Sequence, residues 1–133
     1  MIVADAVTSV HLVIEGEDTH WVEKVLRADP VWFAPPNWRS ECLSAIDKYR
    51  RRGDFGEEGA LTRFRKAKER VRIQPYAPAE EVLHLSVETG CSIYDCEYAA
   101  LAQQRDTDFV TFDKQVIAAG LGVHPSEFLA TRD

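Results

Sequence analysis

Short apolar runs alternate with longer segments of helical periodicity along this chain. Four runs have the length and composition of buried strands and lie at residues 2–4, 31–35, 71–76 and 108–113. Segments in which apolar residues recur every three or four positions predict helices over residues 8–16, 18–30, 36–53, 57–71, 77–90, 92–106 and 114–122. Residues 123–129 predict one or two strand positions followed by a turn.

Strands that alternate with helices are typical of a parallel sheet with helices on both faces. The sequence therefore predicts an α/β fold. No repeat, low-complexity stretch or obvious linker interrupts the pattern, so we expect a single domain over residues 1–133.

The composition is that of a globular protein and argues against several classes. Apolar residues make up 45% of the 133 residues, yet no apolar run approaches the ~20 residues that span a bilayer. The start of the chain lacks the pattern of a secretory signal. Cys42, Cys91 and Cys96 form no CxxC pair, which favours reduced thiols in a cytoplasmic protein over a disulfide frame or a zinc site.

The charge is unevenly distributed. A net charge of −6 by itself disfavours loose binding to nucleic acid. Residues 48–72, however, hold ten of the sixteen basic residues and only four acids, so this segment carries +6 and the remainder −12. A basic segment in an otherwise acidic protein could contact phosphates. The alternative is that these side chains form a solvent-exposed helix face with no ligand.

Two acidic residues follow predicted strands. Asp5 comes directly after the run Ile2–Ala4, and Asp113 ends the run "DFVTFD". Ligands of open parallel sheets bind beyond the carboxyl ends of the strands, so both side chains are in positions where a ligand-binding site can form. Each is also a good N-cap for the next helix, which explains either residue alone. Thr111 would point to the same face as Asp113, where its hydroxyl could hold a carboxylate or a water.

Two further acids lie on the apolar faces of predicted helices. Glu41 is three positions after Trp38 and four before Ala45, so it shares their stripe. An inward-facing glutamate is costly unless it is paired, hydrogen-bonded or bound to a metal, and the alternative is a rim position with the carboxylate in water. Asp95 precedes Tyr98 by three positions, in the first turn, where the helix dipole also favours an anion.

Taken together, these acids indicate a metal site. Carboxylates that meet in one place repel one another unless a cation neutralises them. Oxygen ligands without a His/Cys cluster suit Mg²⁺ or Mn²⁺ better than zinc. Such sites commonly hydrolyse phosphodiesters, because the metal activates a water and stabilises the leaving oxygen.

Three stretches of the chain resemble PIN-domain proteins, in particular the toxin ribonucleases of VapBC toxin–antitoxin modules. They are "MIVADA", "WRSECLSAIDKYRRRG" and "SIYDCEYAALAQQRDTDFVTFDKQV", they occur in the family's order, and the resemblance covers essentially the whole chain. The third is the most specific, because it combines Tyr-Asp, a helix of small residues and a strand that ends in Thr-x-Asp.

The resemblance implies a three-layer α/β/α sandwich around a parallel sheet. It also implies a Mg²⁺- or Mn²⁺-dependent endoribonuclease that is a homodimer and whose acidic site is blocked by an antitoxin. The catalytic residues would be Asp5, Glu41, Asp95 and Asp113. Of these, Asp5, Asp95 and Asp113 would hold the metal, and Thr111 would support the site.

Two details complete these expectations. The basic segment would hold RNA phosphates beside the acidic site, with Arg50, Arg51, Arg52 and Arg65 as the candidate contacts. The family often has Ser or Asn two residues after the first aspartate, whereas this chain has Val7 there. That departure removes one support of Asp5, and Thr8 could replace it only if the turn shifted.

Other functions remain open from the sequence. A PIN-like domain that binds RNA or a protein without cutting fits the same residues, and Val7 favours it. A structural module in which every acid is a cap would keep the carboxylates apart. A receiver-like phosphoacceptor would need an aspartate after the third strand, and "VRIQPY" offers none. The histidines show no metal-ligand spacing, so we expect them to be structural or on the surface.

Overall fold

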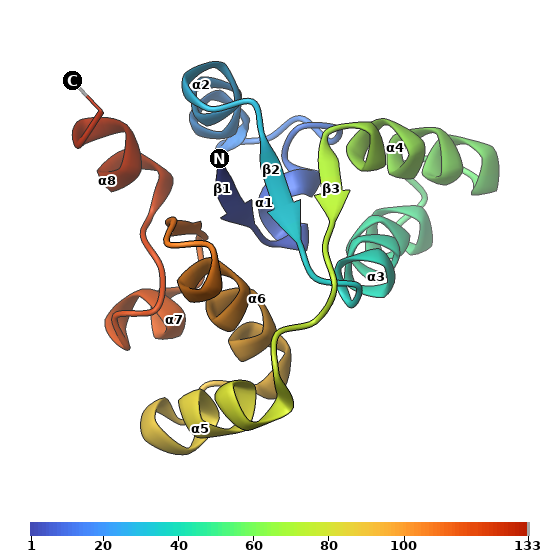
Figure 1. Cartoon of the computed structure of the whole chain (residues 1–133). Helices are drawn as coiled ribbons and strands as arrows, with labels where there is room; N and C mark the ends of the chain where they lie inside the picture. Colours follow the sequence, from blue (N-terminus) through green and yellow to red (C-terminus); the bar gives the residue numbers. More distant parts are fainter. Residues whose placement is uncertain (133) are drawn as a thin grey trace.

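Four parallel strands form the centre of the fold (Figure 1). The structure is a computed structural model and describes residues 1–132. Its strands are β1 (Ile2–Ala4), β2 (Trp32–Ala34), β3 (Val71–Ile73) and β4 (Phe109–Val110). The helices are α1 (Ala6–Val10), α2 (Thr19–Ala28), α3 (Trp38–Arg51), α4 (Glu57–Glu69), α5 (Ala79–Thr89), α6 (Ile93–Gln104), α7 (Lys114–Ala118) and α8 (Pro125–Ala130).

The order of the strands is β3-β2-β1-β4, so β1 is central. Val3 pairs with Phe33 on one side and with Phe109 on the other, and every residue of β1 and β2 is buried. Continuous apolar strands of this kind belong to parallel sheets that are covered on both faces. The pairing also brings the carboxyl ends of β1 and β4 side by side, which decides where the site forms.

Helices cover both faces of this sheet. α6 packs on β1 and β4, and the Tyr98 ring stacks on Phe109 with centroids 5.5 Å apart. α1 packs against α3, and α3 against α4. The indole Nε1 of the fully buried Trp38 donates to Ser9 Oγ at 3.1 Å, which fixes α3 to α1 just behind the end of β1.

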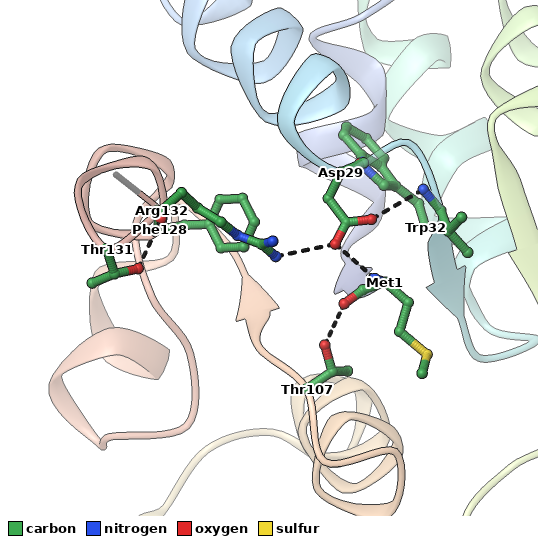
Figure 2. Close-up of polar contacts among 8 residues, drawn as sticks. Met1, Asp29, Trp32, Thr107, Phe128, Thr131 and Arg132 are labelled. Carbon is green, nitrogen blue, oxygen red and sulfur yellow. Dashed lines mark hydrogen bonds and ion pairs between the residues drawn. The ribbon is translucent and has the colours of Figure 1, made fainter.

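A buried carboxylate joins the end of α2 to the start of β1 and to the C-terminal segment (Figure 2). Asp29 Oδ2 accepts from the ammonium of Met1 at 2.6 Å and from Arg132 Nη2 at 3.1 Å. Burial acts to raise the pKa of Asp29, but these two cations and the backbone N–H of Val31 outweigh burial and lower it. The Asp29 carbonyl also accepts from Trp32 Nε1, so the same residue anchors β2.

The expected parallel α/β sheet is confirmed, with shorter strands than the apolar runs indicated. The prediction for residues 123–129 is half wrong. Val123 does bridge to Val110, but α8 follows in place of a turn, because His124 caps it, Pro125 occupies its first turn and Phe128 is buried. The first helix covers residues 6–10 and not 8–16, since its cap is Asp5. No helix within residues 1–132 is long and apolar enough to cross a membrane.

Candidate functional site

Asp5 and Asp113 meet because their strands are neighbours. Asp5 directly follows β1, and Asp113 lies three residues beyond β4. Between them, Thr111 Oγ1 donates to Asp5 Oδ2 at 2.6 Å and accepts from the backbone N–H of Asp113 at 3.1 Å. The fully buried Thr111 hydroxyl therefore holds a carboxylate, one of the two roles that the sequence allowed.

Asp5 and Asp113 are also helix caps, as the sequence permitted. Asp5 Oδ1 accepts from the backbone N–H of Thr8 at 3.0 Å and from its hydroxyl at 2.7 Å, and Asp113 Oδ1 accepts from the N–H of Val116 at 3.0 Å. The cap orients each carboxylate and leaves it facing the same space. Thr8 supports Asp5 from an ordinary N-cap turn, so the shifted turn expected for this contact is not needed.

Glu41 enters the site from the first turn of α3 and is half-buried. Its Oε1 accepts from Tyr98 Oη at 2.7 Å, and its Oε2 accepts from Asn37 Nδ2 at 3.3 Å. The hydrogen bond to Tyr98 joins α3 to α6 and gives an inward-facing carboxylate a partner, as burial requires.

Asp95 lies in the first turn of α6, one turn before Tyr98. Its backbone N–H donates to the hydroxyl of Ser92, the N-cap, at 3.1 Å. The cap is therefore Ser92, whose contact with the Asp95 side chain opposes the rise in the pKa of Asp95, and Asp95 lines the same cavity as the acids at the strand ends.

One cavity of about 530 Å³ collects these side chains. Asp5, Glu41, Asp95 and Asp113 all line it. The remaining lining residues are Ala6, Val7, Ser40, Ser44, Ala45, Lys48, Tyr98 and Phe112. The structure therefore brings all four predicted acids to one place, with α3 on one side and the ends of β1 and β4 on the other.

Burial and neighbouring acids raise the pKa values of three of these residues, Asp5, Glu41 and Asp95. Burial raises the pKa of Asp5, and the charge of Asp113 adds to the rise. Burial also raises the pKa of Asp95, with contributions from Asp113 and Asp5, and that of Glu41, with contributions from Asp5 and Asp95. Mutual repulsion of this kind means that the negative charge of the cavity is not balanced by the protein.

The candidate RNA contacts lie elsewhere. Arg50 and Arg51 pair with Asp47 at 2.5 and 2.8 Å, and Arg52 pairs with Asp54 at 2.6 Å. Arg65 is exposed on α4, and none of these four arginines lines the cavity.

Lys48 is the basic residue that does line it, together with Ser44. Ser44 was not predicted from the sequence, and Lys48 was included only as part of the basic segment 48–72, although a sharper signal was present. They follow Glu41 by seven and three positions, so the helical period places them on the same face of α3.

A divalent cation fits the donors but would require rearrangement of the side chains. Carboxylate oxygens without nitrogen or sulfur ligands suit Mg²⁺ or Mn²⁺. Among residues 1–132, however, no three Asp, Glu, His or Cys side chains are already arranged to hold a metal ion. Both oxygens of Asp5 and one of Asp113 are engaged by hydroxyl or backbone donors. Carboxylate oxygens can accept further contacts, and the repulsion within the cavity favours a cation there.

Comparison with known proteins gives consistent results. A family model described as "PIN domain" matches residues 2–120. A curated protein of Pyrobaculum aerophilum named "Exonuclease VapC9" is 29% identical over 92 residues, which are 69% of this chain and 69% of that protein.

Solved structures share the fold. A Pyrobaculum aerophilum protein, PAE2754, has a TM-score of 0.78 at 22% identity, and the match covers 98% of this chain and 88% of the other. A toxin–antitoxin complex from Klebsiella pneumoniae has a TM-score of 0.71 at 19% identity, and the match covers 94% of this chain and 98% of the other. VapC20 of Mycobacterium tuberculosis, described as a sarcin–ricin loop cleaving toxin, has a TM-score of 0.66 at 17% identity, and the match covers 90% of this chain and 95% of the other.

Proposed function

This chain belongs to the PIN domain family, and from that membership we propose that it is a metal-dependent endoribonuclease that hydrolyses RNA phosphodiesters in the carboxylate cavity. The observation that carries the proposal is the convergence of Asp5, Glu41, Asp95 and Asp113 on one cavity at the carboxyl end of a parallel sheet. The raised pKa values of Asp5, Glu41 and Asp95, due first to burial and then to neighbouring acids, support it, because a structural role for separate caps would not require the acids to share a cavity.

Asp5, Asp95 and Asp113 are the residues that would hold Mg²⁺ or Mn²⁺. A divalent cation at such a site lowers the pKa of water and stabilises the charge that develops on a phosphate. The hydroxyls of Thr8 and Thr111 fix the orientation of Asp5 from both sides. Tyr98 fixes Glu41, which can accept a proton from an attacking water.

Lys48 is our candidate for the phosphate contact at the cavity. It lies one helical turn beyond Ser44 on the same face of α3, and it offers a point charge beside otherwise repulsive acids. We expect Lys48→Ala to weaken RNA binding and to reduce the salt slope of binding by about one, as the loss of one phosphate contact should. Arg65→Ala, on α4, is the matched control. An equal effect of both variants would favour a diffuse basic surface.

The relatives extend the proposal to a toxin of a toxin–antitoxin module. One similar fold comes from a toxin–antitoxin complex, and another is described as a cleaving toxin. An antitoxin partner and a homodimer are therefore parts of the proposal. Co-expression of this chain with a candidate antitoxin, followed by measurement of the mass of the purified complex, tests both.

Two alternatives are separable by experiment. A PIN-like domain that binds RNA without cutting remains a candidate because Val7 replaces a common polar support. Exonuclease activity is the other, because the curated relative carries that name. An endonuclease cuts a circular single-stranded RNA, whereas an exonuclease cuts only the linear form of the same sequence.

The test is cleavage of matched linear and circular RNAs with Mg²⁺ or Mn²⁺ and with EDTA. We expect metal-dependent cutting of both RNAs by the wild type and a loss of about a hundredfold or more in Asp5→Asn and Asp95→Asn. Asp108→Asn, an exposed position outside the cavity, is the control and should cut as the wild type does. If Asp5→Asn and Asp95→Asn cut as fast as the wild type, the assignment is wrong.

A further inference from the structure

The cavity has an apolar wall that the metal and the acids do not account for. Val7 and Phe112 both line it, beside Asp5 and Asp113. Val7 is 51% exposed, although it lies in the first turn of α1 next to a cluster of carboxylates. Because Thr8 provides the support for Asp5, the side chain of Val7 has no role in holding that aspartate.

Phe112 is held rigidly at the edge of the cavity. Its neighbours Thr111 and Asp113 are fixed by hydrogen bonds to Asp5 and to α7. The ring centroid lies 5.0 Å from the His11 ring at 71° and 5.1 Å from the His124 ring at 88°. Burial lowers the pKa of His11, which favours the neutral imidazole in this contact. A half-buried aromatic ring fixed between two others can bind a ligand at little entropic cost.

Other residues of the same cavity have complementary chemistry. Lys48 and Ser44 line it from α3 and offer a cation and a hydroxyl, and the four acids line it as well. A nucleotide has the same division, with an anionic phosphate at one end and a flat, weakly polar base at the other. The volume of about 530 Å³ lies in the range of small-ligand pockets, so a nucleotide unit can enter.

We propose that Val7 and Phe112 form a nucleobase-binding wall that receives one unpaired base next to the scissile phosphate. The inference rests on the proposed ribonuclease function and adds the requirement for a single-stranded RNA with a base at that one position. A base in a duplex is stacked and paired, so it cannot lie against this wall unless it is splayed out. Stacking on an aromatic ring tolerates any base, so the wall selects for an unpaired base more than for a sequence.

The first test replaces each nucleotide around the cut, in turn, by an abasic unit. In the wild type we expect one position adjacent to the cut at which base removal lowers kcat/KM about tenfold, and little effect two or more positions away. In Phe112→Leu the intact RNA should be cut about tenfold more slowly, and base removal at that position should have little further effect. This non-additivity is the signature of a direct contact.

Matched variants separate the wall from general damage. Val7→Ala removes apolar contact area without adding a polar group, so it should lower kcat/KM for the intact RNA several-fold and reduce the effect of base removal. Val87→Ala makes the same change at a valine that is 76% exposed on α5, outside the cavity, and should leave kcat/KM and the effect of base removal unchanged. Phe55→Leu is the corresponding control for Phe112, since Phe55 packs against Arg63 outside the cavity.

A binding measurement gives a second readout. A single-stranded RNA that carries 2-aminopurine at the sensitive position is mixed with the uncleaving variant Asp95→Asn. Stacking on Phe112 should quench the fluorescence, and the added change Phe112→Leu should restore it.

The outcomes separate the two proposals. Wild-type protein that cuts no RNA contradicts the ribonuclease function. Two results overturn the nucleobase wall alone, in a protein that does cut RNA. Either no position is sensitive to base removal, or base removal lowers kcat/KM as much in Phe112→Leu as in the wild type.

Discussion

Both carboxylate oxygens of Asp5 are held by hydroxyl groups, from Thr8 on one side and Thr111 on the other. Two donors fix the orientation of the side chain while its charge is still opposed by Asp113. Under the proposed function, Asp5 is both a helix cap and a preorganised metal ligand. The cap explanation, which accounts for each acid taken alone, is therefore compatible with a shared site.

Thr111→Val tests this preorganisation. The change keeps the shape of a fully buried side chain but removes the donor to Asp5 and the acceptor for the Asp113 N–H. We expect a 10- to 100-fold loss of metal affinity and of cleavage, as for other residues that orient a ligand. Thr111→Ser keeps the hydroxyl and should retain most of the activity. Equal losses in both variants would point to packing and not to the hydrogen bond.

The sequence predicts the four acids but not all of their partners. An inward Glu41 requires a partner, and no local spacing identifies it, because Tyr98 is 57 residues away in the chain. The position of Thr111 two residues before Asp113 is a local signal, so its orientation could be expected. The helical period also places Lys48 on the face of Glu41, seven positions further along, so its place in the cavity was predictable from the sequence.

At the scale of the elements, the segment that follows α7 packs against the end of β4. Gly122 lies against the strand end that carries Thr111, and a Cβ there would come within 2.8 Å of Thr111 Cγ2 and 2.9 Å of the Phe109 carbonyl oxygen. The backbone oxygen cannot move without shifting β4. This close approach explains why a glycine follows Leu121 in the sequence.

Gly122→Ala should therefore destabilise the fold by about 1–3 kcal/mol and move Thr111 away from Asp5, with a loss of cleavage. Urea unfolding measures the first effect and the RNA assay the second. Gly16→Ala is the control, since nothing lies within 4 Å of a Cβ at that position and little change is expected. If both glycines tolerate alanine equally, the close packing at Gly122 is not important.

Helices were predictable where an apolar stripe runs along them, and the predictions failed at α1 and α8. α3 and α6 follow the apolar stripes that the sequence displays. α8 was missed because its helical state depends on burial of Phe128 and on the cap at His124, whereas "VHP" taken locally favours extended backbone.

At the scale of the whole molecule, the net charge is −6, and four of the acidic residues line a single cavity. Burial and mutual repulsion raise the pKa values of Asp5, Glu41 and Asp95. A carboxyl with a raised pKa binds a proton more tightly when the protein is folded. Its contribution to stability is therefore complete below the ordinary carboxyl pKa and is lost as pH rises through the folded value.

In metal-free protein at pH 8, Asp5→Asn should raise the free energy of unfolding by about 1 kcal/mol, because it removes a repelled charge while keeping a good N-cap. The gain should shrink as pH falls toward 4, where the wild-type carboxyl becomes protonated. Urea unfolding in EDTA across this range measures it. A gain that is independent of pH would contradict the electrostatic explanation.

Titration calorimetry with Mn²⁺ tests the central claim, that the carboxylate cavity holds a divalent cation through Asp5, Asp95 and Asp113. Wild-type protein and Asp108→Asn should bind Mn²⁺ with a dissociation constant of about 1 mM or tighter. Asp5→Asn and Asp95→Asn should each lose about tenfold or more in affinity. Absence of Mn²⁺ binding by the wild type up to several millimolar, or equal affinity in all four proteins, would contradict the account.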